Sequence, residues 1–110
     1  AGASAQRVRI ERLESGPDGR VEIGALLARL AQLQVNEVLA ECGPTLAGSL
    51  LQSGLVDELL VYFAPTLLGP QARPLAQLPA LANLAQRPQW RITDLRMIGP
   101  DVRIMLRPGG

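Results

Sequence analysis

The sequence predicts an α/β domain with a mixed sheet, and three patterns along its 110 residues point to this class. In the first half, leucines at helical spacing alternate with short apolar runs, as in parallel α/β units. Residues 58–64 are apolar at nearly every position, which is typical of a strand covered on both faces. The chain then closes with two segments in which polar and apolar residues alternate, and this pattern indicates an antiparallel pair.

The first forty residues predict two strands and one helix. Residues 7–13 alternate polar and apolar side chains, which is the period of a half-buried strand, and a turn rich in glycine follows at 15–19. Leucines recur at helical spacing in the next segment, so we expect an amphipathic helix over residues 24–34. Residues 35–41 are mostly apolar and predict a short, buried strand.

A second helix is expected after the sharp break at residues 42–44, which are Cys-Gly-Pro. Thr45 is suited to the N-cap, because its hydroxyl can accept a hydrogen bond from an amide of the first turn. Gly54 can adopt the left-handed conformation that commonly ends a helix. The apolar residues expected on the buried face of this helix are Leu46, Leu50 and Leu51.

The second half of the chain predicts three strands and a long connection. Residues 58–64 are expected to form the central strand of the sheet. Residues 66–88 are rich in proline, alanine and leucine and predict a long surface connection, with one short helix near 78–84. Residues 90–98 and 101–106 are expected to pair as antiparallel strands, with one face in solvent and the other on the core.

Composition excludes several kinds of chemistry. The chain has no histidine, which rules out a Ser-His-Asp triad, a Cys-His pair and a histidine-ligated metal. All eleven basic residues are arginine, so neither a Schiff-base lysine nor a phosphate-loop lysine is available. A lone cysteine, Cys42, forms no intrachain disulfide and no zinc cluster, and we expect it to be a small, buried apolar side chain.

Charge and hydropathy also limit the expected partners and location. The formal net charge is +1 and only 3% of residues are aromatic, so we expect no nucleic-acid partner. The apolar runs are too short to span a membrane, and the first residues lack the basic start and apolar core of a signal peptide. The sequence therefore predicts a cytoplasmic protein without a membrane partner.

Residues 41–49 are the strongest candidate for a binding site. A predicted strand ends at Glu41, Gly43 follows, and a helix then begins. Ligands of open α/β sheets bind beyond the carboxyl ends of strands, and the free amides at the start of a helix attract phosphate. On these residues alone, an anion site and a plain structural turn both remain open. Arg73 in the long connection could reach a phosphate, although a solvated loop arginine is the more common case.

Three motifs carry a resemblance to a known family. The string E-x-G-P-T-L at 41–46 is followed by G-L-V-D-E-L at 54–59 and by A-P-x-L-L-G at 64–69. With the closing segment 94–106, they closely resemble the C-terminal reductase domain of the bifunctional riboflavin-biosynthesis deaminase–reductase. The resemblance covers nearly the whole chain. It implies a dihydrofolate-reductase-like, three-layer α/β/α fold with a mostly parallel sheet that ends in an antiparallel hairpin.

The resemblance also implies a reaction and a set of site residues. The reaction is NADPH-dependent reduction of 5-amino-6-(5-phosphoribosylamino)uracil to its ribitylamino form, a step of riboflavin biosynthesis. Glu41 is implied to contact the substrate, while no catalytic residue and no metal ligand are assigned. Cys42 stands where the family usually has glycine or alanine. A homodimer is also expected. The residues implied to contact NADPH are Gly43, Pro44, Thr45, Leu46, Ala47, Gly48 and Ser49.

Length indicates that the chain is part of a larger unit. The family's reductase domain is roughly twice as long, which is within the usual range for a domain. Residues 1–110 are therefore expected to be its C-terminal part, without the first half of the reductase domain or the deaminase domain, and to be inactive alone. Two alternatives remain: a non-catalytic dimerisation scaffold, suggested by unpaired strand edges, and a pterin-type reductase of the same fold.

Overall fold

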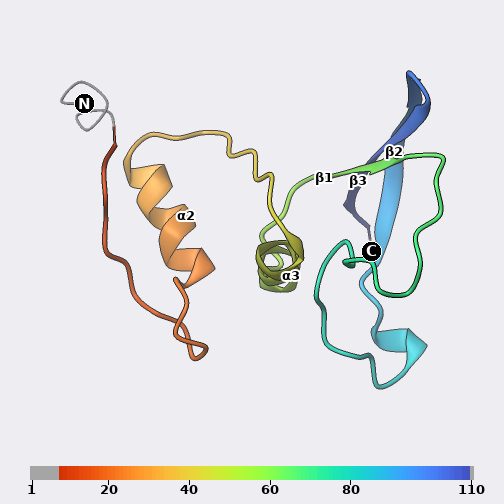
Figure 1. The fold of residues 1–110 in the computed structure, drawn as a ribbon. Helices are drawn as coiled ribbons and strands as arrows, with labels where there is room; N and C mark the ends of the chain where they lie inside the picture. Colours follow the sequence, from red (N-terminus) through yellow and green to blue (C-terminus); the bar gives the residue numbers. More distant parts are fainter. Residues whose placement is uncertain (1–7, 110) are drawn as a thin grey trace. The chain divides into compact units, whose positions relative to one another are not determined.

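A computed structural model describes residues 8–109 of the chain. It divides into two compact units, Ala1–Leu39 and Ala40–Gly110. Among the described residues, the first unit contains one helix, and the second contains one helix, a short 3-10 helix and a three-stranded sheet (Figure 1). Helices and an antiparallel sheet occur together, as expected for a chain of the α/β class.

The helix of the first unit is α2, which spans Ile23–Gln32 and confirms the prediction of a helix over 24–34. Glu22 is its N-cap, and the carboxylate accepts hydrogen bonds from the amides of Gly24 and Ala25 at 3.0 and 2.6 Å. These bonds satisfy two amides of the first turn, which have no partner inside the helix. The local sequence is therefore sufficient to start this helix.

The strand predicted over residues 7–13 is not formed. Residue 7 lies outside the described residues, and no strand is assigned to residues 8–13. The nearest pairing is an isolated antiparallel bridge between Ser15 and Val21, across the predicted turn. Alternation alone does not make a strand, because each strand needs a neighbour that satisfies its backbone groups.

An ion pair joins the segment before the turn to α2. The Arg29 guanidinium donates through Nε and Nη2 to the two carboxylate oxygens of Glu11, the second bond being 2.8 Å long. This hydrogen bond lowers the pKa of Glu11 and raises that of Arg29. Segment and helix are thus connected by side chains rather than by a backbone ladder.

The strand predicted over residues 35–41 is also absent from the structure, because this stretch is assigned neither helix nor strand. Val38 and Leu39 are 55% and 77% exposed, whereas the prediction placed them in a buried strand. No other strand of the described chain pairs with this stretch. A short apolar run without such a partner leaves its apolar side chains in solvent.

The helix of the second unit is α3, which spans Pro44–Ser53. The expected N-cap was Thr45, but Gly43 takes this position with an extended backbone (φ −75°, ψ 178°). Pro44 explains the shift, because its fixed φ suits the first helical position and its missing N–H needs no partner there. Gly54 ends the helix at φ 73°, as predicted. The prediction that Leu46 is buried is wrong, since it is 45% exposed.

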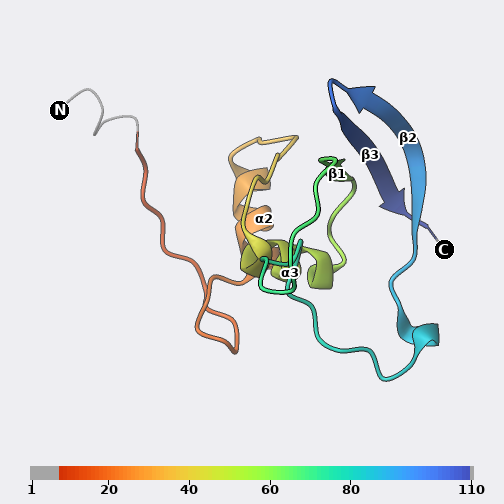
Figure 2. The same cartoon turned by 45° about the vertical axis from the view of Figure 1, so that its right-hand side comes forward.

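The sheet is antiparallel and has the order β1-β3-β2. Its strands are β1 (Leu59–Phe63), β2 (Trp90–Ile98) and β3 (Asp101–Pro108), which confirms the three predicted strands of this half and the closing hairpin (Figure 2). The first of them was expected to be central, but within residues 8–109 the central strand is β3, which pairs with both neighbours, and β1 has one partner. The short helix expected near 78–84 is a 3-10 turn, η1, at Leu84–Gln86.

The pairing register divides the sheet into an apolar face and a polar face. Side chains of paired residues lie on the same face, and a bulge between Ile92 and Asp94 keeps the alternation of β2 in step with β3. The polar face includes Asp94, Arg96 and Arg103. The hydrophobic residues of the apolar face are Leu59, Val61, Phe63, Trp90, Ile92, Leu95, Met97, Val102, Ile104 and Leu106.

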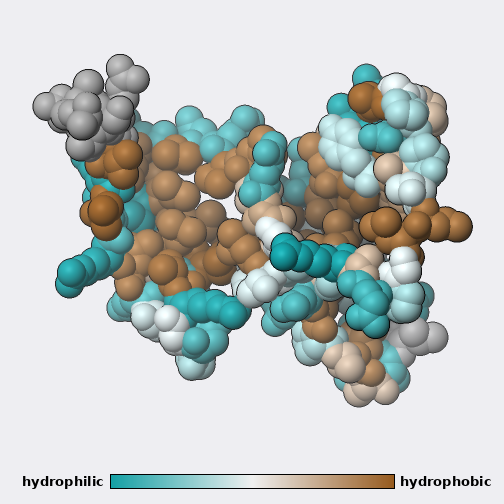
Figure 3. Space-filling view, in the orientation of Figure 1, coloured by the Kyte–Doolittle hydropathy of each residue, from teal (hydrophilic) through white to brown (hydrophobic). Residues whose placement is uncertain are grey.

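No hydrophobic side chain among the described residues is fully buried. On the apolar face, Leu95 and Met97 are 57% and 63% exposed, and the space-filling view shows hydrophobic residues over much of the visible surface (Figure 3). A stable domain needs such a face to be covered, so the expected core side of the hairpin is only partly buried in the described second unit. No helix in this range is long and apolar enough to cross a membrane.

Candidate functional site

The start of α3 presents free backbone amides. No side chain caps this helix, and Pro44 has no N–H to offer. Ala47 is the first residue to donate within the helix, to the carbonyl of Gly43 at 3.0 Å. The amides of Thr45 and Leu46 are therefore left without an intrahelical acceptor, at the positive end of the helix dipole. This arrangement attracts an anion.

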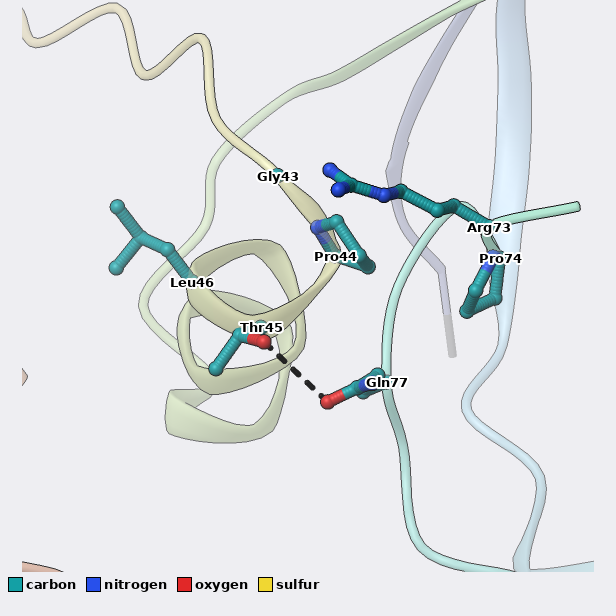
Figure 4. Close-up of a pocket in the computed structure, with 7 residues that line it drawn as sticks. All are labelled: Gly43, Pro44, Thr45, Leu46, Arg73, Pro74 and Gln77. Carbon is teal, nitrogen blue, oxygen red and sulfur yellow. Dashed lines mark hydrogen bonds between the residues drawn. The ribbon is translucent and has the colours of Figure 1, made fainter.

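The residues that carry these amides line an open cavity of about 520 Å³ within the second unit. One wall is the first turn of α3 with its N-cap, and the other is a short piece of the long connection between β1 and β2 (Figure 4). The volume is in the range of small-molecule sites. The lining residues are Gly43, Pro44, Thr45, Leu46, Arg73, Pro74 and Gln77.

Gln77 holds the second wall against the helix. Its backbone N–H donates to the carbonyl of Pro44 at 2.9 Å, and its side-chain oxygen accepts from the Thr45 hydroxyl at 3.3 Å. Gly48, one turn further along, is buried, and a Cβ there would lie 2.0 Å from the carbonyl oxygen of Gln77. Only glycine therefore permits this close approach of connection and helix.

Arg73 supplies the positive charge of the second wall. Its side chain is exposed and extends toward Gly43 and Pro44 (Figure 4). Within residues 8–109 it forms no ion pair, in contrast to Arg103 and Arg107, which pair with acidic side chains. The sequence favoured a solvated loop arginine here, because nothing in the local pattern indicates that the connection folds back onto α3.

The structure separates the seven residues expected to contact the cofactor into two groups. Four of them, residues 43–46, line the cavity, whereas Ala47, Gly48 and Ser49 do not. The Ser49 hydroxyl donates to the carbonyl of Thr45 at 3.2 Å, so its proton is used inside the helix. Gly48 contributes to the cavity only indirectly, because its lack of a side chain lets the Gln77 backbone pack against α3.

The two residues before this segment lie outside the cavity. Glu41, expected to contact the substrate, is exposed and is not part of the lining. Cys42 is exposed as well, which corrects the expectation of a buried side chain. The residues that would bury this thiol as part of a strand at 35–41 have no partner strand in the described chain.

A charged cluster on the polar face of the sheet is separate from the cavity. Asp94 accepts hydrogen bonds from Arg96 at 2.8 Å and from Arg103 at 3.2 Å. Partial burial alone would raise the pKa of Asp94, but the two hydrogen bonds outweigh it and the pKa lies below its usual value.

A further cavity, of about 170 Å³, lies between the end of α3 and the start of β2 and is lined mainly by apolar residues such as Leu51 and Trp90.

Comparisons with known proteins identify the family. The profile of the RibD C-terminal domain matches residues 2–104. The chain is 50% identical to the riboflavin biosynthesis protein RibD of Escherichia coli over 88 residues, which are 80% of this chain and 24% of that protein. It is 38% identical to the 5-amino-6-(5-phosphoribosylamino)uracil reductase of Buchnera aphidicola over 96 residues, or 87% of this chain and 46% of that one.

A solved structure agrees with these matches. RibD of Acinetobacter baumannii, in its form 2, superposes with a TM-score of 0.76 at 35% identity, over 83% of this chain and 27% of that one. The chain thus spans about a quarter of the length of the RibD proteins it matches. Because the family profile covers nearly all of its residues, the chain belongs to the RibD C-terminal domain family.

Proposed function

We propose that this chain is the C-terminal part of an NADPH-dependent 5-amino-6-(5-phosphoribosylamino)uracil reductase, which forms the ribitylamino compound in riboflavin biosynthesis. The observation that carries the proposal is the open cavity at the uncapped start of α3. It supports the proposal because the same residues, 43–46, belong to the segment that the resemblance assigns to the cofactor. The relative from Buchnera aphidicola is named for this reaction.

The residues of the cavity fit the phosphates of a dinucleotide. The amides of Thr45 and Leu46 are free to donate hydrogen bonds to a phosphate oxygen. The space beside Gly43 is open, because no atom beyond its chain neighbours lies within 4 Å of where a Cβ would stand. A phosphate oxygen can therefore approach the backbone closely at this corner. Backbone amides bind such a group without any histidine or lysine, which agrees with a chain that has neither.

NADPH supplies the hydride when it is bound, so the protein's part is binding and orientation. We assign the phosphate contacts to the start of α3 and a substrate contact to the exposed carboxylate of Glu41. We assign no catalytic residue to this chain. The complete domain is proposed to have a dihydrofolate-reductase-like, three-layer fold, in which further, parallel strands extend the sheet and helices cover the apolar face.

The full enzyme is proposed to be a cytoplasmic homodimer. A second candidate function, a dimerisation scaffold, is favoured by the apolar face and by the free edges of β1 and β2 within the described residues. Unpaired edges recruit other strands. The two functions are compatible, and turnover separates the proposed reaction from that of a pterin reductase, since dihydropterin and the pyrimidine ribosylamine are different substrates.

Substitution of Gly43 in the full-length protein tests the proposed function. Gly43→Asp places a carboxylate where the cofactor phosphate is expected, and it also offers a cap that competes for the same amides. We expect the Kd for NADPH to rise at least about tenfold, since about 1.4 kcal/mol of repulsion suffices for this. The open space at Gly43 lets the variant fold without a clash. Isothermal titration calorimetry measures the change.

Two control variants separate charge from capping. The side chain of Gly43→Asn competes for the amides but carries no charge, and that of Gly43→Ala neither competes nor carries a charge. We therefore expect the Kd for NADPH to be highest for the Asp variant, lower for Asn and lowest for Ala. If all three variants bind NADPH as tightly as the unmodified protein, the start of α3 is not the cofactor site and the proposal fails.

A further inference from the structure

We infer that Arg73 binds a phosphate group of the nicotinamide cofactor, so that the connection between β1 and β2 forms the second wall of the cofactor site. This inference rests on the proposed function and extends it to a segment far along the chain from residues 41–49. Its basis is the position of the guanidinium across the cavity from the first turn of α3 (Figure 4).

The position of the connection that carries Arg73 depends on contacts that do not involve the charge of Arg73. Gln77 makes two hydrogen bonds to the first turn of α3, one from its backbone and one through its side chain. The Gln77 backbone also packs so closely against Gly48 that a Cβ there would stand 2.0 Å from the Gln77 carbonyl oxygen. Arg73, four residues earlier, lines the same cavity, and its side chain extends toward Gly43 and Pro44 (Figure 4).

The charges around the cavity favour a phosphate. The lining contains one guanidinium and two free amides, and no acidic side chain is part of it. An arginine pairs with a phosphate through two parallel hydrogen bonds, and such charge-assisted bonds are about twice as strong as neutral ones. The amides on one wall and the guanidinium on the other would bind the same phosphate group of a dinucleotide, or two neighbouring phosphate groups.

A purely structural role would require partners for Arg73 within its own chain. The described residues offer none, since no hydrogen bond or ion pair joins Arg73 to any of them. Removing this side chain therefore breaks no hydrogen bond or ion pair among the described residues. A loss of cofactor affinity in a variant at this position would report on binding rather than on folding.

The test uses the full-length protein with Arg73→Ala and Arg73→Lys, titrated with NADPH and with NADH. We expect Arg73→Ala to raise the Kd for NADPH about tenfold, and Arg73→Lys to recover part of the loss because the charge remains but the paired bonds do not. The matched control is Arg12→Ala, which removes the same charge from an exposed side chain of the first unit.

The two cofactors distinguish the possible phosphates. If Arg73 binds the 2′-phosphate, Arg73→Ala raises the Kd for NADPH and leaves the Kd for NADH unchanged. If Arg73 binds the pyrophosphate, both Kd values rise by the same factor. Unchanged Kd values for both cofactors in Arg73→Ala overturn the inference. If Gly43→Asp still weakens NADPH binding in that case, only the proposed role of Arg73 is refuted. If neither variant changes NADPH binding, the proposed function is refuted as well.

Discussion

Gly48 shows how a single hydrogen atom in place of a side chain shapes the site. In an ordinary helix, replacement of glycine by alanine stabilises by about 1 kcal/mol, because glycine loses more backbone entropy on folding. In α3 the added Cβ would stand 2.0 Å from the backbone oxygen of Gln77, and backbone cannot rotate away as a side chain can. The tertiary contact therefore opposes the local helical preference.

We expect Gly48→Ala to destabilise the full-length protein by about 1–3 kcal/mol, the usual cost of overpacking. It should also weaken NADPH binding, because Arg73 and Gln77 move with the displaced connection. The midpoint of urea unfolding measures the stability. In the control, Gly24→Ala in α2, the Cβ would meet the Glu22 carboxylate at 3.1 Å, and this flexible side chain can shift. Equal effects of the two alanines would contradict the packing argument.

Among the elements, the hairpin of β2 and β3 carries a cluster of charges across its ladder. Asp94 on β2 joins Arg96 on the same strand to Arg103 on β3. The Nε atom of Arg103 is buried and finds no acceptor in the described chain, so this guanidinium depends on the bond from Nη2 to Asp94. Loss of the carboxylate charge would leave Arg103 without its acidic partner in the cluster.

The lowered pKa of Asp94 predicts a dependence of stability on pH. Folding favours the ionised carboxylate, so the stabilisation is present above the ordinary aspartate pKa of about 3.9 and is lost as the pH falls through the lower, folded value. We expect the unmodified protein to be more stable than Asp94→Asn at pH 7, by a small amount because the cluster is partly exposed to solvent. The difference should become smaller as the pH falls from 7 to 3.

Thermal unfolding of both proteins between pH 3 and pH 7 measures this difference. Glu11 has a lowered pKa for the same reason, through its hydrogen bond from Arg29, and contributes in the same direction. A difference in Tm between the protein and Asp94→Asn that stays constant across this range would contradict the assignment to ionisation.

At the scale of the whole molecule, the described chain presents an apolar face and has no buried hydrophobic side chain. Burial of apolar area is the main favourable term in folding, and it must offset the loss of chain entropy. The residues of the apolar face lie on one side of a three-stranded sheet, and several of them, such as Leu95 and Met97, are more than half exposed. The remainder of the reductase domain is the cover that we propose.

We therefore expect the isolated 110-residue polypeptide to lack a cooperative unfolding transition, whereas the full-length protein has one. Differential scanning calorimetry compares the two, and sedimentation shows whether the isolated chain associates through its free edges. A monomer that unfolds cooperatively would contradict this prediction and would also count against the scaffold function.

Sequence reasoning succeeded where the pattern is local. The amphipathic spacing before residue 34, the glycine at 54 and the alternation around Gly99 each act within one turn of helix or between adjacent strands, and the structure confirms all three. The motifs at residues 41–46, 54–59 and 64–69, with the closing segment 94–106, also indicated the family that the profile match confirms. The preference for helix or strand and the pairing of adjacent strands depend on a few consecutive residues, so they can be predicted without knowing the fold.

Only the tertiary structure decided which strands have partners and what lies opposite the start of α3. Residues 8–13 and 35–41 have strand-like patterns but no strand beside them, and β1 lies at the sheet edge because β3 takes the central place. The sequence likewise could not place Arg73. The contact between its connection and the start of α3 joins residues far apart in the chain, and it depends on hydrogen bonds made by Gln77 and on the absence of a side chain at Gly48. Sequence patterns report how a residue relates to its near neighbours, whereas a sheet order and a cavity depend on the packing of distant ones.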